Sequence, residues 1–246
     1  ALRFAGLSWF DSVCHTFSTV ATGGFSPHNA SISAFNNVYI ESIIILFMFL
    51  GGINRSLHFQ LVRRNFSVVF KNPEFRTYCI LILAGVLFAT WGLTRVSETG
   101  DAGQAFRSAA FTVVSINTTT GFVTDDFNLW PEYLKLFLVF IMMIGGCSGS
   151  TSGSFKVIRI IILLKIIMRE LKNLIYPRAI FHVKVGDKTV DADDLSNVAA
   201  LTFLFIGFTA LGGVILSSMG VDLTTALSAT VASLFNVGPG LGDVGA

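Results

Sequence analysis

The chain has 246 residues, of which 52% are hydrophobic and 13% are charged. Soluble domains usually carry about 25% charged residues, and here the 17 basic and 15 acidic residues are clustered between long uncharged stretches. A transmembrane helix needs about 20 mostly apolar residues. The composition therefore excludes a soluble globule, a disordered chain and a nucleic-acid-binding protein. It predicts a polytopic membrane protein surrounded by lipid.

In chain order, the predicted elements form units of a short helix and a Gly/Thr-rich loop set between full-length apolar segments. The short helices are predicted at residues 7–18, 101–116 and 223–235, and the apolar segments at about 38–57, 77–94, 131–168 and 198–219. The short helices cannot cross a bilayer, so each is predicted to be re-entrant. The fold class is an all-α polytopic membrane protein with repeated units.

The three loops that follow the short helices align without gaps. Thr22, Thr119 and Asn236 fall in register, and so do Gly24, Gly121 and Gly238, at separations of 97 and 117 residues in both sets. A short apolar helix before each loop makes a chance match improbable. The loops are therefore predicted to be internal repeats of one structural unit, rather than ordinary external turns.

The composition of these loops indicates a particular chemistry. Non-helical backbone is tolerated at membrane depth where it is buried in protein or lines a water-filled cavity. Rings of backbone carbonyls can replace the water shell of a monovalent cation, and threonine adds hydroxyl oxygens. Divalent cations usually recruit carboxylates, and the aligned positions contain none. The loops therefore suit K⁺ or Na⁺.

The same residues carry a family resemblance. Residues 236–240, Asn-Val-Gly-Pro-Gly, resemble the Thr-Val-Gly-Tyr-Gly filter of potassium channels, and residues 22–26 and 119–123 look like degenerate copies. Together with a Gly/Ser-rich interruption at 145–154, they resemble the Trk/Ktr/HKT superfamily of potassium transporters, in particular its bacterial TrkH branch. The resemblance implies four span–pore-helix–span repeats around one ion path. Three loops are present, so we expect a fragment running from the second-repeat pore loop to the fourth-repeat filter.

On this interpretation the chain has three parts. Residues 1–66 hold the second-repeat pore helix, filter and inner span, and residues 67–180 hold the third repeat with a broken inner span. Residues 181–246 hold a cytoplasmic hairpin and the outer span, pore helix and filter of the fourth repeat. The hairpin is expected because apolar and polar residues alternate around Gly-Asp at 186–187.

Two sets of site residues follow from the resemblance. The filter residues, expected to bind K⁺ through backbone oxygens, are Thr22, Gly23, Gly24, Thr119, Thr120, Gly121, Asn236, Val237 and Gly238. The gate residues, expected to obstruct the path below the filter, are Gly145, Gly146, Ser148, Gly149, Ser150, Thr151, Ser152, Gly153 and Ser154. For the second set, helix packing through the small residues at 145, 149 and 153 is the alternative. Breaking a helix there also leaves backbone groups that the serines and Thr151 could bond.

The resemblance also implies partners. It implies a homodimer and a cytoplasmic nucleotide-binding regulatory subunit resembling TrkA, with NAD or ATP bound only through that partner and no covalent cofactor. The function it implies is the ion-conducting membrane subunit of a K⁺ uptake system. The alternatives are a Na⁺- or H⁺-coupled secondary transporter with alternating access and a membrane-embedded scaffold. Enzyme motifs fail on inspection, since the Gly-rich segments lack the endings of nucleotide-binding loops, and the four His residues are scattered.

Charge placement predicts the orientation. The stretches 55–76 and 156–188 carry 13 of the 17 basic residues and fall on the same side if the spans alternate. The positive-inside rule places them in the cytoplasm of a bacterial inner membrane. The short-helix loops then face outside, together with Glu98, Asp101, Asp125, Asp126, Glu132 and Asp222. Asp101 or Gly103, and Asp222, are expected to cap the short helices that follow them.

Overall fold

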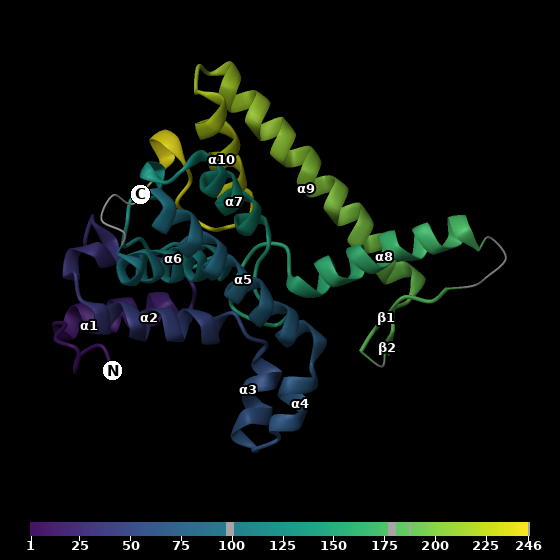
Figure 1. Cartoon of the computed structure of the whole chain (residues 1–246), viewed down its shortest axis with the longest axis horizontal. Coiled ribbons are helices and arrows are strands. Elements are labelled where there is room, and N and C mark those ends of the chain that lie inside the picture. Colours follow the sequence, from purple (N-terminus) through teal and green to yellow (C-terminus); the bar gives the residue numbers. More distant parts are fainter. Residues whose placement is uncertain (97–100, 177–180, 187, 246) are drawn as a thin grey trace.

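The computed structural model describes residues 1–96, 101–176, 181–186 and 188–245, which form a mainly helical protein (Figure 1). The elements are α1 (Trp9–Val20), η1 (Ser31–Phe35), α2 (Val38–Gly51), α3 (Arg55–Val62), α4 (Phe66–Lys71), α5 (Pro73–Val96), α6 (Ala102–Asn117), η2 (Phe127–Leu129), α7 (Glu132–Met143), α8 (Val157–Ile175), β1 (Lys184–Val185), β2 (Lys188–Thr189), α9 (Ala192–Ser218), α10 (Leu223–Leu234) and η3 (Gly242–Val244). The predicted all-α class with repeated units and a small β-hairpin is confirmed. Predictions at Glu98, Arg178 and Asp187 lie outside the described residues.

Two helices of the described part, α5 with 24 residues and α9 with 27, are long and apolar enough to cross a membrane. At a rise of about 1.5 Å per residue both exceed the ~30 Å hydrocarbon core. Large apolar side chains of α9 point outward, with Phe203 76% and Val214 68% exposed. A surface of this kind is stable only against lipid or another protein.

Two of the short helices each pack against a long one. The pairs are α5 with α6 and α9 with α10. The helices approach closely at small residues: a Cβ on Gly85 of α5 would lie 3.0 Å from Val113, and one on Gly213 of α9 would lie 2.7 Å from Leu227. Small residues at such crossings let helices approach closely in a membrane. This packing holds the short helices in place beside the spans.

The apolar segment predicted at 38–57 forms two helices that together could be one bent span, rather than one continuous helix. The helix α2 ends at Gly51, and α3 begins at Arg55 after a bend of 105°. The Asn54 side chain caps α3 by accepting from the Ser56 amide at 2.8 Å. The bend lets Gly52 lie against the buried ring of Tyr78, whose hydroxyl donates to the Phe49 carbonyl at 3.0 Å.

The interruption predicted in the segment 131–168 is confirmed. The helix α7 ends at Met143 and α8 starts at Val157, and the chain between them is not helical. We call residues 145–154 the helix break. Ile144 and Phe155 form an isolated parallel β-bridge at its base. The break is thus a closed loop between two helices.

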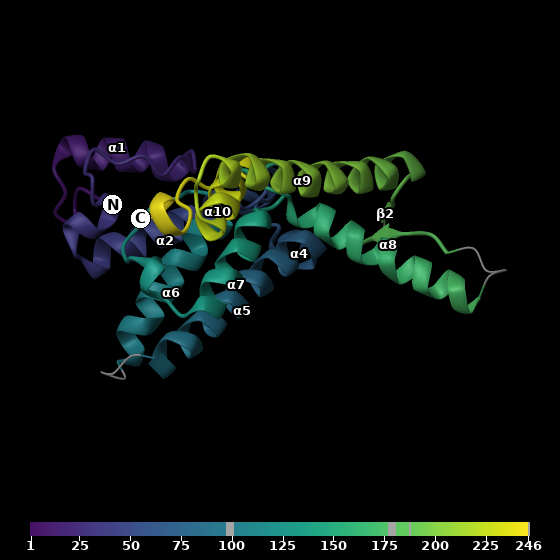
Figure 2. The same ribbon diagram turned by 90° about the horizontal axis from the view of Figure 1, so that it is seen from above.

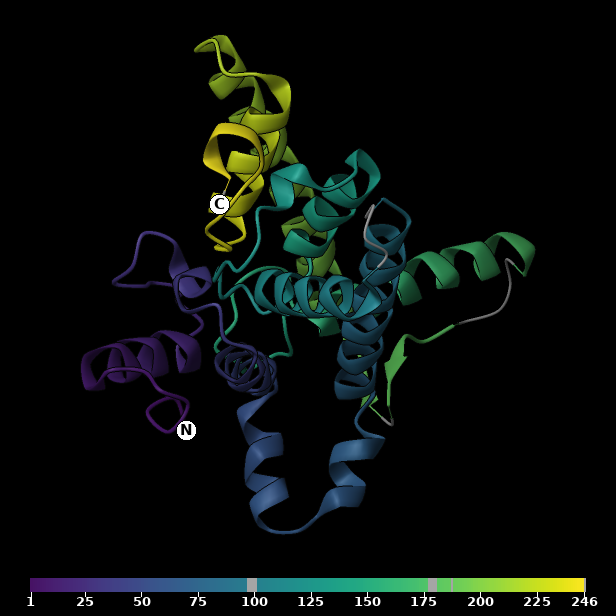
Figure 3. The same cartoon turned by 60° about the vertical axis from the view of Figure 1, so that its left-hand side comes forward.

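Two parts project from the rest of the molecule. The α3–α4 hairpin extends away from the other helices (Figure 3), and α8 with the β1–β2 hairpin extends in a different direction (Figures 1 and 2). In the β-hairpin, Lys184 pairs with Thr189 and Val185 with Lys188, as the Gly-Asp signal predicts. The boundary predicted between residues 66 and 67 falls at the start of α4, and residue 180 lies outside the described residues.

The contact between Gly52 and Tyr78 yields a stability prediction. A Cβ on Gly52 would lie 2.2 Å from the Tyr78 hydroxyl oxygen, so Gly52→Ala is expected to destabilise the protein by about 1–3 kcal/mol through overpacking. Combining it with Tyr78→Phe removes the clashing oxygen, so the double variant should lose less than the sum of the single losses. The measurement is the midpoint of thermal unfolding in detergent.

Gly207→Ala is the matched control for this prediction. Gly207 lies in α9 with no atom within 4 Å of the added Cβ, so its substitution should leave the midpoint unchanged or raise it slightly. Strict additivity of Gly52→Ala and Tyr78→Phe would contradict the packing described here.

Candidate functional site

The three short helices end in the same way. Each closes with a hydrogen bond from the second loop residue back to a carbonyl in the last turn, the longer bond of a Schellman motif. These bonds join Gly23 N to Ser18 O at 2.8 Å, Thr120 N to Ser115 O at 2.9 Å and Val237 N to Ala232 O at 2.8 Å. The donors and the acceptors are separated by the same 97 and 117 residues as the aligned loops.

The loops also share their backbone conformation. Thr22, Thr119 and Asn236 have φ of 51°, 54° and 57°, a left-handed region that is a real outlier for a β-branched threonine. Gly24, Gly121 and Gly238 have φ of 70°, 80° and 106°. The register predicted from the sequence is thereby confirmed at the level of backbone geometry. We call residues 22–26, 119–123 and 236–240 loops 1, 2 and 3.

The loops touch one another through glycine. A Cβ on Gly24 would lie 1.9 Å from the Thr120 carbonyl oxygen, and one on Gly121 would lie 2.3 Å from the Val237 carbonyl oxygen. Real Cβ atoms cannot approach so closely, so both positions need glycine for space as well as for positive φ. Loop 2 lies between the other two, and its Thr119 and Thr120 are each 1% exposed. The structure thus brings the predicted filter segments together at one place.

Each loop, or in loop 3 the residue directly after it, is tied to its own short helix by a different side chain. The Ser115 hydroxyl donates to the Phe122 carbonyl at 2.7 Å, and the Ser228 hydroxyl accepts from the Leu241 amide at 2.9 Å. In loop 1 the partner of the Ser26 hydroxyl is His15 Nε2, at 3.0 Å. His15 is fully buried, with Nδ1 2.7 Å from the Asp11 carbonyl. These three hydrogen bonds were not predicted from the sequence, because they depend on how each loop folds back along its helix.

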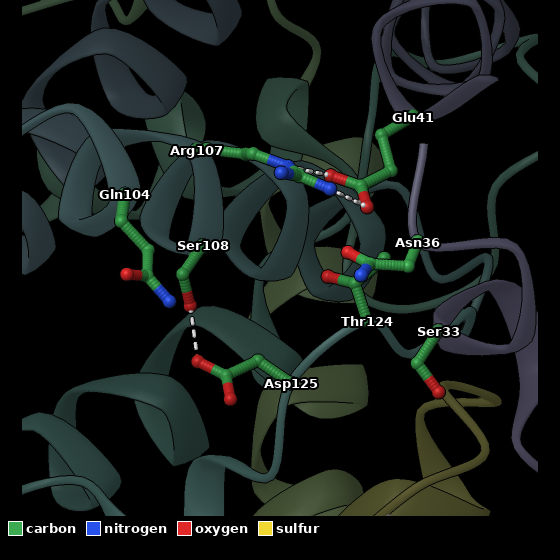
Figure 4. Close-up of a pocket in the computed structure, with 8 residues that line it drawn as sticks. All are labelled: Ser33, Asn36, Glu41, Gln104, Arg107, Ser108, Thr124 and Asp125. Carbon is green, nitrogen blue, oxygen red and sulfur yellow. Dashed lines mark hydrogen bonds and ion pairs between the residues drawn. The ribbon is translucent and has the colours of Figure 1, made fainter. Parts of the chain in front are cut away.

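The outer side of loop 2 is held by the preceding repeat. The Val123 carbonyl accepts from the amides of Ile32 and Ser33 in η1 at 3.1 and 3.2 Å. Nearby, Arg107 of α6 forms a two-bond ion pair with the buried Glu41 of α2, both bonds at 2.5 Å (Figure 4). This pair lines a polar cavity of about 130 Å³ together with Asn36, Gln104, Ser108 and Asp125, among others. The cavity lies beside the loops, not among the predicted filter residues.

Acidic and hydroxyl side chains cap the short helices. The caps are Ser8 for α1, Asp101 for α6 and Asp222 for α10, which confirms the caps predicted at Asp101 and Asp222. Hydrogen bonds from Thr225 hold the pKa of the Asp222 carboxyl below its usual value. A carboxylate at the N-terminus of a helix also interacts favourably with the positive end of the helix dipole. All three helices therefore start at their caps and end at the loops.

The helix break lies directly against the ends of the short helices where the loops begin. The Gly153 amide donates to the Thr119 hydroxyl at 2.6 Å, and a Cβ on Gly153 would lie 3.1 Å from Asn236. On the other side, Thr151 donates its hydroxyl to the Gly51 carbonyl at 3.1 Å, and Gly51 itself contacts Thr22. The two sets of residues singled out from the sequence are thus neighbours in space.

Polar side chains within the break satisfy its own backbone. Ser152 accepts from the Gly146 amide, Ser150 donates to the Cys147 carbonyl and Ser154 donates to the Met142 carbonyl, at 2.6–2.9 Å. Ser148 takes part through its backbone amide instead, by donating to the carboxylate of Glu74. Lys156 is the N-cap residue of α8, but its side chain makes no capping hydrogen bond. Its ammonium donates instead to the Ser152 carbonyl within the break. Neither Glu74 nor the inward turn of Lys156 was foreseen from the sequence.

The described residues contain no group of three or more His, Cys, Asp or Glu side chains able to hold a metal ion. The oxygen atoms concentrated at the loops are backbone carbonyls and threonine hydroxyls. Such neutral oxygens suit a weakly hydrated monovalent cation.

Comparison with known proteins gives a consistent result. The family model described as "TrkH: Cation transport protein" matches residues 4–246. The "Trk system potassium uptake protein TrkH" of Halomonas elongata is 42% identical over 100% of this chain and 51% of the relative, and that of Salmonella typhimurium is 39% identical over 99% and 51%. The chain thus spans about half the length of these curated relatives.

A solved structure supports the same assignment. The crystal structure of the potassium transporter TrkH from Vibrio parahaemolyticus superposes with a TM-score of 0.92 at 36% identity, covering 99% of this chain and 53% of that chain. The family is one of transport proteins, not of enzymes. By sequence and by fold, this chain belongs to the TrkH family of cation transport proteins.

Proposed function

We propose that this chain is part of the ion-conducting membrane subunit of a K⁺ uptake system, in which oxygens of loops 1, 2 and 3 bind dehydrated K⁺. The observation that carries the proposal is the contact of the loops through Gly24 and Gly121, in matching backbone conformations. Carbonyl groups held this rigidly can take the place of water around a cation. The names of the relatives, Trk system potassium uptake proteins, favour K⁺ over Na⁺.

The helix break fits the role of a gate. It lies where the short helices end, against Thr119 and Asn236, which is the end of the loops away from the helix caps. The alternative of helix packing through residues 145, 149 and 153 needs these residues on one helical face. The break is not helical, so the spacing does not create such a face. We propose that the break obstructs the path below the loops.

The charge distribution supports a cytoplasmic position for this end of the path. The α3–α4 hairpin and α8 carry the basic residues Arg55, Arg63, Arg64 and Lys71, and Lys165, Arg169 and Lys172. The positive-inside rule then favours an outward position for the loops in a bacterial inner membrane.

From the family resemblance we also propose a homodimer and a TrkA-like cytoplasmic subunit that binds NAD or ATP. The basic α3–α4 hairpin and α8 would form the docking surface for this subunit.

A symporter with alternating access is the alternative. The second break, between α2 and α3, is a feature of that class as well. Re-entrant helices α1, α6 and α10 converging on one point favour the channel-like function instead. Single-channel recording distinguishes the two, because a conducting pore passes resolvable unitary currents and a symporter does not.

Loop 2 provides the test of selectivity. In the full-length protein, Gly121→Ser adds a side chain where even a Cβ would lie 2.3 Å from the Val237 carbonyl. The displaced carbonyls should lower the preference for K⁺ over Na⁺ by about tenfold or more. The measurement is Rb⁺ and Na⁺ flux into proteoliposomes. Gly207→Ser on the open face of α9 is the control, and unchanged selectivity of Gly121→Ser at normal yield would contradict the filter assignment.

The gate has a separate test. Deleting residues 149–153 in the full-length protein removes the contacts of Gly153 and Thr151 with the loop ends. Flux measured without the cytoplasmic subunit should rise, because the path is no longer obstructed. A deletion protein that folds and still needs the partner to conduct would refute the gate. Reduced yield without excess flux would instead indicate a packing role.

A further inference from the structure

A buried carboxylate from outside the helix break bonds both the break and the helix that follows it. Glu74 lies in the first turn of α5 and is 6% exposed. Its Oε1 atom accepts a hydrogen bond from the Ser148 amide at 2.6 Å and another from the Ile158 amide at 3.3 Å. Ser148 belongs to the break, and Ile158 lies in the first turn of α8. One oxygen atom thus joins a membrane span to the break and to the helix that follows it.

The bond to Ile158 supplies a cap that α8 otherwise lacks. The N-cap residue of α8 is Lys156, which makes no side-chain capping hydrogen bond. The first amides of a helix need an acceptor, and a carboxylate there also interacts favourably with the helix dipole. Glu74 provides both from another helix. The start of α8 is therefore fixed by a residue that is distant in the sequence.

The bonds from Glu74 differ in kind from the other bonds that hold the break. Hydrogen bonds to a charged group are stronger than those between neutral groups. Glu74 is the one carboxylate that reaches the break among the described hydrogen bonds, whereas Gly51 and Gly52 hold it through neutral carbonyls.

We propose that Glu74 is the positioning residue of the gate. Its carboxylate accepts hydrogen bonds from the Ser148 and Ile158 amides and so holds the break and the first turn of α8 in place. The path below the loops opens when these two hydrogen bonds break. The proposal rests on the proposed function of the helix break as a gate. It adds the element that holds the gate shut and the helix, α8, through which a cytoplasmic partner would release it.

The test uses two substitutions in the full-length protein. Glu74→Ala removes both bonds and should raise K⁺ flux without the cytoplasmic subunit by about tenfold or more. Glu74→Gln keeps the shape and an acceptor oxygen but loses the charge, so it should raise the flux a few-fold. The stimulation by the partner should shrink accordingly. Glu132→Ala is the matched control, because Glu132 also lies in the first turn of a helix but its side chain is 86% exposed.

A native thiol reports the position of the break. Cys147 lies in the break and is fully buried. With Cys14 and Cys79 replaced by alanine, a small membrane-permeant thiol reagent should label Cys147 slowly in the parent. Labelling should be faster in Glu74→Ala and, to a lesser degree, in Glu74→Gln. A purely structural role for Glu74 would lower yield without selectively exposing this thiol.

The outcomes separate this proposal from the one it rests on. Folded Glu74→Gln and Glu74→Ala proteins with parental basal flux and parental Cys147 labelling would overturn the role of Glu74. If Glu74→Ala does not fold, the same two measurements on Glu74→Gln decide. Deletion of residues 149–153 is measured in parallel. If the deletion gives excess flux but the Glu74 variants do not, the helix break is still a gate and only the role of Glu74 is rejected. If the deletion gives no excess flux, the gate itself is rejected.

Discussion

The close contact of three stretches of irregular backbone is the constraint on which the rest of this structure depends. Carbonyl groups inside a membrane are stable only if protein or a bound ion satisfies them. Here Gly24 meets the Thr120 carbonyl and Gly121 meets the Val237 carbonyl with no room for a side chain. The left-handed residues at the helix ends turn the chain back in the same way at each loop. The spans, the caps and the ties from His15, Ser115 and Ser228 all serve to hold this geometry.

The second layer of the structure lies below the loops and is built differently. The helix break consists of glycine and serine, with its backbone satisfied by its own hydroxyls. Its hydrogen bonds to the α2–α3 bend, to the Thr119 hydroxyl and to the Glu74 carboxylate connect it to its surroundings. Loops held by many close contacts suit selection between ions, and a segment held by a few hydrogen bonds suits opening and closing. The break contacts the loops at Gly153, so a movement of the break would change the contacts of Thr119 and Asn236.

The features predicted from the sequence are those that depend on local chemistry. The register of the loops follows from glycine and threonine at fixed spacing, and the break follows from a dense Gly/Ser run. The bend after Gly51 was missed because the packing of Gly52 on Tyr78 that accompanies it joins residues far apart in the sequence. Glu74 was missed for a similar reason, since its two amide partners lie 74 and 84 residues further along the chain. Contacts between residues so far apart in the sequence can be identified only from the three-dimensional structure.

The proposed function depends on K⁺ binding by the oxygens of the three loops. Anomalous diffraction from crystals of the full-length protein soaked in Rb⁺ can detect this binding, because Rb⁺ substitutes for K⁺ and can be located independently of the protein. We expect a peak at about 3 Å from the carbonyl oxygens of Thr120 and Val237. That peak should disappear when Na⁺ replaces Rb⁺. Crystals of active protein with Rb⁺ bound elsewhere and none at these loops would contradict it.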